Sequence, residues 1–162
     1  MGSQQPIKSE DLAYIAGFLD GDGSIMVQVK NRTDTPRGWR LMFTICFYQD
    51  SSHKEPLLWI RDQLGAGYIS NRTDHITELR INGFEKTQQI LLQLQPFVKF
   101  KKKQTEIALR ILSKLKGENI SSLSRNIRLK IAEDIICLRE ENYRSHKRRY
   151  SSESLKSVLG FA

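Results

Sequence analysis

Two stretches of the chain, at residues 24–30 and 40–48, alternate strictly between side chains of two kinds. In each stretch every second residue is a large apolar one, such as Ile25, Val27 and Val29 in the first. A period of two is typical of a strand that buries one face. The loop between them, NRTDTPRG, contains residues that favour turns, so the two strands are predicted to pair as an antiparallel hairpin.

A second, shorter hairpin is predicted at residues 68–72 and 78–81, around the turn NRTDH. Apolar residues at helical spacing predict helices over 9–21, 54–64, 84–94, 105–115 and 123–142. Ser9 is predicted to cap the first helix, and Gly65 to end the second. This order indicates a mixed α/β (α+β) fold in which helices cover one face of a four-stranded antiparallel sheet. We expect a single domain over residues 1–162, with a flexible N-terminus at 1–8 and a basic tail at 144–162 that has room for a short helix.

The second face of the predicted sheet is polar and partly basic. The chain carries a formal net charge of +8 and a pI of about 9.6, which favours a polyanionic partner such as nucleic acid. Arginine, lysine and glutamine on strands can read base edges in the major groove of DNA, at about 1–3 kcal/mol per good bidentate pair. The alternatives are an ordinary solvated sheet face and a basic protein with scattered lysines. The candidate DNA-binding residues on this face and at its basic margins are Ser24, Met26, Gln28, Lys30, Arg32, Arg40, Met42, Thr44, Cys46, Tyr48, Ser70, Arg72, Glu78, Arg80, Lys102, Lys147 and Arg148.

Composition argues against several other classes of protein. The two cysteines, Cys46 and Cys137, are too few and too far apart for a disulfide framework or a four-ligand zinc site, and they fit a reducing compartment. No run of residues reaches the ~20 apolar positions of a membrane span, so no membrane partner is expected. The N-terminal segment MGSQQPIKSE lacks the apolar core of a signal peptide.

The segment IAGFLDGDGS, at residues 15–24, places small residues and two carboxylates at the end of a predicted helix. Ala13, Ala16 and Gly17 recur at spacings of three or four, which lets a second helix approach closely, either within the fold or in a dimer. Asp20 and Asp22 lie at the negative end of the helix dipole, where an acid is unfavourable by about 0.3–1 kcal/mol. This placement is explained if a hard cation such as Mg2+ binds there, because that ion takes few protein ligands and completes its shell with water and phosphate oxygens.

Residues 15–23 resemble, position by position, the nine-residue motif of the LAGLIDADG homing endonucleases, with four conservative substitutions. The predicted αββαββα order and the segments GYIS and LQPFVKFKKKQ are similar to the single-motif branch of this family, whose chloroplast-intron members act as homodimers. A monomeric, pseudo-symmetric member would need a second copy of the motif and about twice the length, and DGDG occurs once here. The resemblance implies that the motif helices of two subunits pack at the dimer axis, through Ala13, Ala16, Gly17 and Asp20.

The resemblance also implies a metal site. Asp22 would bind the catalytic metal ions with help from the Gly21 carbonyl, and Asp20, which in this family more often supports the helix end, is the second candidate ligand. The implied cofactor is Mg2+. Mn2+ would substitute for it, and Ca2+ would support binding of DNA without cleavage.

Three further positions match active-site residues of the family. Gln49 falls where the family has a polar residue that orders water. Lys101 matches a lysine near the scissile phosphate, where a positive charge can offset charge in the transition state; simple attraction to phosphate would also explain it. A further basic residue corresponds to His53 or to Lys54, and the sequence leaves that choice open.

The function implied is sequence-specific cleavage of both strands of a long pseudo-palindromic DNA site, leaving 3′ overhangs, in intron homing. The expected partners are double-stranded DNA and a second copy of the chain, in an organelle, with the chloroplast as first choice and the mitochondrion as second. The alternative is a catalytically inactive DNA-binding protein, or an RNA maturase that binds intron RNA, on the same scaffold. A nuclease of the His-Asn-His type is disfavoured because the three histidines, His53, His75 and His146, are scattered.

Overall fold

The structure is a computed structural model, and it describes residues 6–34, 36, 38–115, 120–142 and 151–161. Along the chain, the regular elements of these residues are α1 (Ser9–Asp22), β1 (Gly23–Asn31), β2 (Trp39–Asp50), α2 (Glu55–Leu64), β3 (Tyr68–Asn71), β4 (Ile76–Asn82), α3 (Phe84–Leu94), α4 (Lys102–Leu115), α5 (Arg125–Glu141) and α6 (Ser152–Phe161). Short 3-10 turns lie at Ser51–His53 (η1) and Ile120–Ser122 (η2). The predicted αββαββα order, with helices at the C-terminal end, is confirmed.

The strands form one four-stranded antiparallel sheet in the order β1-β2-β4-β3. β1 and β2 make the first hairpin, with Ile25 opposite Ile45, and β3 and β4 make the second. β2 and β4 also pair, with Ile45 opposite Ile81, so the central strands come from different hairpins. Both predicted hairpins and the predicted sheet are therefore confirmed.

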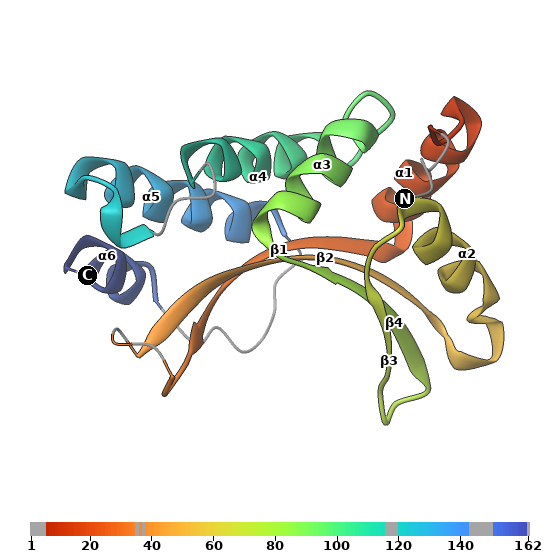
Figure 1. Ribbon diagram of the computed structural model, residues 1–162, viewed down its shortest axis with the longest axis horizontal. Coiled ribbons are helices and arrows are strands. Elements are labelled where there is room, and N and C mark those ends of the chain that lie inside the picture. Colours follow the sequence, from red (N-terminus) through yellow and green to blue (C-terminus); the bar gives the residue numbers. More distant parts are fainter. Residues whose placement is uncertain (1–5, 35, 37, 116–119, 143–150, 162) are drawn as a thin grey trace, which may run out of the picture.

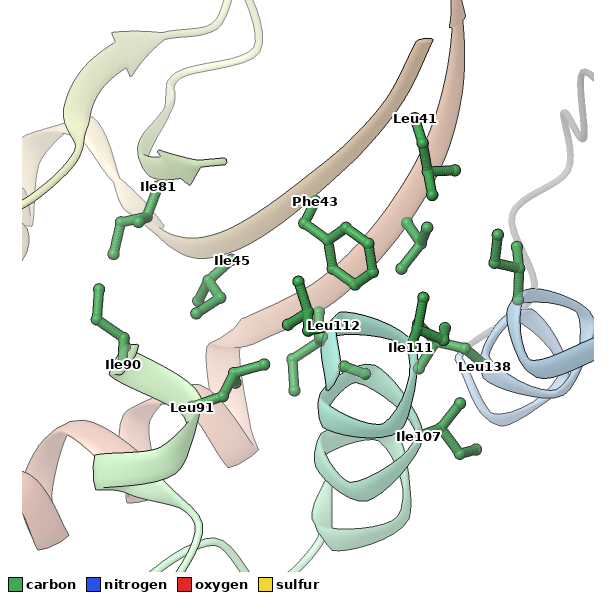
Figure 2. Close-up of a cluster of buried hydrophobic side chains, with 14 of the residues drawn as sticks. Leu41, Phe43, Ile45, Ile81, Ile90, Leu91, Ile107, Ile111, Leu112 and Leu138 are labelled. Carbon is green, nitrogen blue, oxygen red and sulfur yellow. The ribbon is translucent and has the colours of Figure 1, made fainter. Parts of the chain in front are cut away.

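Helices cover one face of this sheet, and the sheet curves so that its other face is concave (Figure 1). Between sheet and helices lies the core, in which Phe43 and Ile45 of β2 and Ile81 of β4 face Leu91 of α3 and Leu112 of α4 (Figure 2). Complete burial of such a side chain contributes about 1.5–3 kcal/mol. A slip of one residue in register would turn these side chains to the concave face, so the core fixes the register.

Helix boundaries differ from prediction by one to three residues at several ends, and the starts of α1 and α4 differ for identifiable reasons. Ser9 is the first residue of α1 and not its cap: Lys8 precedes the helix, and its side chain makes no capping hydrogen bond. The predicted cap is therefore wrong. α4 begins at Lys102, earlier than the predicted 105, because the turn before it already has helical hydrogen bonding, with the Thr105 N–H donating to the Lys101 carbonyl at 2.9 Å. Gly65 ends α2 in the left-handed conformation, as predicted.

The C-terminal region adds a further layer at one end of the molecule (Figure 1). α6 buries Leu155 and Leu159 and packs against α5, so the short helix predicted in the tail is present. The first part of that tail and most of the predicted flexible N-terminus lie outside the described residues. Within the described part of the chain, no helix is long and apolar enough to cross a membrane.

Candidate functional site

The exposed end of α1 joins β1 without a loop. Gly23 makes this join possible, because a Cβ at that position would lie 2.6 Å from Leu19 Cδ1 and 2.8 Å from the Leu19 backbone. No larger residue fits there without displacing the helix. The two carboxylates of the motif lie at this end: Asp22, the last residue of the helix, is exposed, and Asp20 is partly buried.

Asp20 binds a distant segment of the chain through its carboxylate. Its Oδ2 accepts the backbone N–H groups of Lys99 at 2.7 Å and Phe100 at 3.1 Å, and its Oδ1 accepts that of Lys101 at 2.9 Å. Hydrogen bonds to an ionised acceptor are stronger than neutral ones. The basic turn before α4 is thereby fixed against the end of α1, across as many as 81 residues of sequence.

Lys101 lies under this turn, close to both carboxylates of the motif. Its side chain is buried, and Nζ donates to the main-chain carbonyl of Asp20 at 2.6 Å. Burial lowers the pKa of the Lys101 ammonium, while the nearby charges of Asp20 and Asp22 act in the opposite direction. The structure thus brings together three residues that the sequence singled out, and it gives the lysine a more specific environment than its exposed lysine neighbours have.

The other predicted active-site residues lie near the end of β2. Phe47 pairs with Gly23, which directly follows α1, and Gln49 lies two residues further along β2. Gln49 Oε1 accepts the backbone N–H of Asp50 at 2.8 Å. His53 and Lys54 are exposed in and directly after η1, and His53 Nδ1 lies 2.9 Å from Ser52 Oγ. The hydrogen bonds of the described residues do not connect His53 or Lys54 to the carboxylates of α1.

The carboxylates at the end of α1 do not by themselves form a metal-binding cluster. Among the residues that the structure describes, no group of three or more His, Cys, Asp or Glu side chains gathers in one place. Asp20 is occupied by three backbone donors, so its assignment as a ligand is weakened, whereas no hydrogen bond found in the described part of the chain involves the Asp22 carboxylate. One exposed carboxylate beside the Gly21 carbonyl suits a hard cation that keeps most of its water, as Mg2+ does.

One side of α1 presents small residues to solvent. Ala13 and Gly17 are exposed, and a Cβ added at Gly17 or Gly21 would meet no atom within 4 Å. Tyr14 on the same helix is 57% exposed, and Phe100 in the turn held by Asp20 is 87% exposed.

Two of the residues predicted to contact a partner helix are engaged within their own chain. Ala16 is fully buried in the core of its own chain, because it lies on the same side of α1 as Ile15 and Leu19. Asp20 uses its carboxylate on the 99–101 turn. The prediction that the Ala16 side chain contacts a second subunit is therefore wrong. Contacts of Ala13, Gly17 and Asp20 with a second subunit remain predictions.

The concave face of the sheet carries most of the predicted DNA-binding residues, but not all of them are accessible. Thr44, Cys46 and Glu78 are buried, so their prediction as base-reading residues is wrong. They lie on β2 and β4, the two central strands, where neighbouring side chains from both flanking strands cover them. Burial raises the pKa of the Cys46 thiol to about 11 and that of the Tyr48 hydroxyl to about 12.

Hydrogen bonds between strands order this face. Tyr48 OH lies 2.9 Å from Ser24 Oγ, which links β2 to β1. Thr44 donates to Asn82 Oδ1 at 2.7 Å, and Asn82 Nδ2 donates to Tyr68 OH at 3.3 Å, which links β2, β4 and β3. Asn82 and Tyr68 were missed as candidate DNA-binding residues. The alternation of Tyr68 with Ile69 could have revealed Tyr68, whereas Asn82 lies one residue beyond the predicted strand.

The margins of the face are basic. Lys30 and Arg40 are opposite one another at the far end of the first hairpin. Arg32, in the adjoining loop, is bound to Asp34, and this hydrogen bond lowers the pKa of Asp34 to about 2. Lys102 is exposed at the start of α4. Lys147 and Arg148 lie outside the described residues. Of the remaining candidates, Ser24, Met26, Gln28, Met42 and Ser70 are partly exposed on the concave face.

The match to known protein families covers this whole arrangement. The family model described as LAGLIDADG endonuclease matches residues 15–106 of the 162, which include the end of α1, the sheet and the 99–101 turn. This chain belongs to the LAGLIDADG endonuclease family. The family motif contributes both carboxylates of the candidate site, and the matched region ends just after Lys101.

Two curated members of the LAGLIDADG endonuclease family are similar in sequence. DNA endonuclease I-CreI of Chlamydomonas reinhardtii is 34% identical over 106 residues, which span 65% of this chain and 64% of I-CreI. DNA endonuclease I-CvuI of Chlorella vulgaris is 31% identical over 114 residues, which span 68% of this chain and 71% of I-CvuI. The matched part is thus just under two thirds of the length of I-CreI.

Solved structures of homing endonucleases confirm the fold over nearly the full length. I-CvuI in complex with its target, in the presence of Ca, matches with a TM-score of 0.81 over 94% of this chain and 96% of that one, at 24% identity. The archaeal intron-encoded homing endonuclease I-Vdi141I, complexed with DNA, matches with a TM-score of 0.76 over 93% and 94%, at 23% identity.

Proposed function

We propose that this chain is a sequence-specific endonuclease that cuts both strands of DNA as a homodimer, with divalent metal ions. The observation that carries the proposal is the exposed Asp22 at the end of α1, with Lys101 held beside it by Asp20. An exposed acid is unfavourable at the negative end of a helix, so its position there is better explained by a bound cation than by helix stability. Family membership, and the names of I-CreI and I-CvuI as DNA endonucleases, support the same reading.

The homodimer completes a site that one chain leaves unfinished. The exposed side of α1 is lined by Ala13, Gly17 and Gly21, so a second helix can approach its backbone closely. The exposed aromatic rings of Tyr14 and Phe100 flank this side and gain a covering in the dimer. A two-fold axis along the paired helices brings together one Asp22 from each copy. The DNA site then has the same approximate symmetry, as a long pseudo-palindrome.

Each residue of the site has a distinct task in the proposed reaction. Asp22 and the Gly21 carbonyl would hold the metal, and Asp20 fixes the turn that carries Lys101. Lys101 supplies positive charge where negative charge develops on the cleaved phosphate. Bound Mg2+ would activate water and stabilise the leaving oxygen.

Two positions near the end of β2 complete the proposal. Gln49 orients water at the end of α1. His53 or Lys54 supplies an additional basic group once DNA is bound. The expected products carry 3′ overhangs.

The concave sheet face is the proposed DNA-binding surface. Its basic margins and ordered polar side chains suit a major groove, where strands are an established reading element. I-CvuI and I-Vdi141I were each solved in complex with DNA, which supports a DNA partner. I-CvuI complexes were prepared with Ca and with Mg, which fits a divalent cofactor. We place the activity in intron homing in an organelle, the chloroplast first and the mitochondrion second, because I-CreI and I-CvuI come from Chlamydomonas and Chlorella.

The test is a cleavage selection. The protein is incubated with a library of randomised palindromic DNA sites, with Mg2+, Mn2+ or Ca2+, and the cut ends are sequenced. Cutting at one long near-palindrome with Mg2+ or Mn2+, and binding without cutting with Ca2+, is the expected result. Retention of DNA or of structured intron RNA without cutting under any ion would refute the endonuclease and support the inactive binder or the maturase.

A single substitution tests the role of the motif carboxylate. Asp22→Asn removes a metal ligand and changes little else, so we expect cutting to fall below detection while the affinity for the selected site in Ca2+ stays within about threefold of the parent. Asp62→Asn is the matched control, because Asp62 is an exposed acid on α2 whose only described partner is its neighbour Arg61. Cutting by Asp22→Asn at the parental rate would show that the metal is held elsewhere.

A further inference from the structure

A buried carboxylate lies among the accessible arginines of the concave face. Glu78 of β4 has a side chain only 7% exposed, and each of its oxygens accepts a hydrogen bond from a different arginine. Oε2 accepts from Arg80 at 2.7 Å, and Oε1 accepts from Arg72 at 3.3 Å. Arg72 follows β3 and Arg80 is on β4, so one acid fixes guanidinium groups from both sides of the second hairpin.

The two arginines are held to different extents. Arg72 has a second support, because its Nε and one terminal nitrogen donate to both oxygens of Asp74, at 3.0 and 2.6 Å. For Arg80, Glu78 provides the one side-chain hydrogen bond among the described residues. Arg80 therefore depends on Glu78 alone, whereas Arg72 depends on Glu78 and Asp74 together.

Both guanidinium groups keep donors free for a ligand. A guanidinium has five N–H donors. Arg72 uses three of them and retains one on each terminal nitrogen, and Arg80 uses one. Two terminal donors are what a bidentate contact to the O6 and N7 atoms of guanine requires. The side chains of Arg72 and Arg80 are 48% and 23% exposed, so both are accessible from the concave face.

On the basis of the proposed function, we propose that Glu78 is a specificity-determining positioning residue that holds Arg72 and Arg80 in the orientation needed to read guanine. Glu78 does not read a base itself, because it is buried and both of its oxygens are occupied. Its contribution is to remove rotamer freedom from two long side chains before DNA arrives, since fixing such a side chain otherwise costs binding free energy. The neighbouring Tyr48 and Ser70, which pair with Glu78 across the sheet, keep the carboxylate enclosed.

The experiment compares base preferences, position by position, in a binding selection carried out in Ca2+. Arg72→Ala and Arg80→Ala first identify the base pair that each arginine reads. Glu78→Gln has nearly the same shape, but it keeps only a neutral acceptor on one side and places an N–H donor towards an arginine on the other. We expect it to lower the preference for guanine about tenfold at the Arg80 base pair and by a smaller factor at the Arg72 base pair, within the range of a bidentate contact. Asp74→Asn, the matched control, should affect the Arg72 base pair alone.

The energetic coupling between Glu78 and Arg80, measured with the double variant, provides a second test. A purely structural role of Glu78 would not produce this coupling. In the Arg80→Ala background, Glu78→Gln should cause no further loss at the Arg80 base pair, because its effect passes through that arginine. Urea unfolding of each variant identifies a general loss of folding. Should Glu78→Gln unfold, Arg80→Lys, which keeps the charge and lacks the planar fork, replaces it and should lower preference at the same base pair.

Two outcomes would overturn the proposal. The first is a folded Glu78→Gln variant, or an Arg80→Lys variant, with parental preference at both base pairs. The second is a change of preference at a base pair that neither arginine reads, which would make Glu78 a direct reader. A parent protein that selects a DNA site but never cuts it would refute the proposed endonuclease and leave this test intact, whereas a parent without base preference would overturn both.

Discussion

The three hydrogen bonds to Asp20 lead to a quantitative prediction for stability. In Asp20→Asn an amide NH2 group replaces one of the two carboxylate oxygens. The remaining oxygen can rotate to accept the backbone N–H groups of Lys99 and Phe100, which share Oδ2 in the structure. The amide nitrogen then faces the N–H of Lys101, so that one bond is lost and two donors oppose one another.

The magnitude follows from the type of bond. A hydrogen bond to a charged group contributes about 1.5–3 kcal/mol and a neutral one about 0.5–1.5 kcal/mol. One hydrogen bond is lost, and two hydrogen bonds change from a charged to a neutral acceptor. Because the site is partly exposed, hydrogen bonds to water recover some of the lost free energy. We therefore expect the free energy of unfolding to fall by about 2–3 kcal/mol, which lowers Tm by roughly 2–4 °C per kcal/mol in a chain of this size.

Urea unfolding at neutral pH, followed by circular dichroism, measures this change. Asp62→Asn serves again as the control, because its ion pair with Arg61 is exposed, and it should change stability by about 0.5 kcal/mol or less. Cutting by Asp20→Asn should also decrease, since Lys101 loses its fixed position while Asp22 is intact. Stability of Asp20→Asn within about 0.5 kcal/mol of the parent would refute the view that Asp20 fixes the turn.

Three further changes have defined outcomes. Gly17→Leu adds a side chain on the open side of α1, so the chain should fold but sediment as a monomer, and an unaltered dimer would place the interface elsewhere. Partial burial raises the pKa of Asp134, but hydrogen bonds from Arg110 and Lys114 of α4 lower it by more. The pKa of Asp134 is therefore below its ordinary value. Its stabilising contribution is therefore present above about pH 4 and lost as pH falls through the lowered pKa. Asp134→Asn should lower the free energy of unfolding, measured in urea, by about 1–3 kcal/mol at pH 7 and by much less at pH 3. A thiol reagent should label exposed Cys137 in the native protein and spare buried Cys46, and equal labelling rates would contradict the burial of Cys46.

The sequence contained enough information to predict the sheet because each strand has one buried face. Residues such as Phe43 and Ile45 differ in polarity from the residues between them, so a local pattern reports their environment. No local sequence pattern indicates which residues of the concave face are buried. Thr44 and Cys46 are covered by side chains of neighbouring strands, and the order β1-β2-β4-β3 that makes β2 central is a property of the assembled sheet.

The motif made the two carboxylates of the candidate site predictable, and the family resemblance made Lys101 predictable. Asp22 and Asp20 stand out because acids are unfavourable at the end of a helix. The attachment of Asp20 to the turn at 99–101 was not predictable, because nothing in the spacing of residues 79 to 81 positions apart indicates contact. Ser9 failed as a cap for a related reason: its residue type favours the cap position, but the chain enters the helix one residue earlier.

The direct join of α1 to β1 at Gly23 has a consequence for the length of the DNA site. In the proposed dimer, α1 lies on the symmetry axis and β1 belongs to the sheet that contacts DNA, and no flexible residue separates the two. The separation of the two reading surfaces is therefore a rigid dimension of the protein. One inserted base pair moves a half-site by about 3.4 Å and turns it by roughly 35° around the duplex. Such an enzyme should tolerate a changed base within a half-site far better than one base pair added or removed between the half-sites.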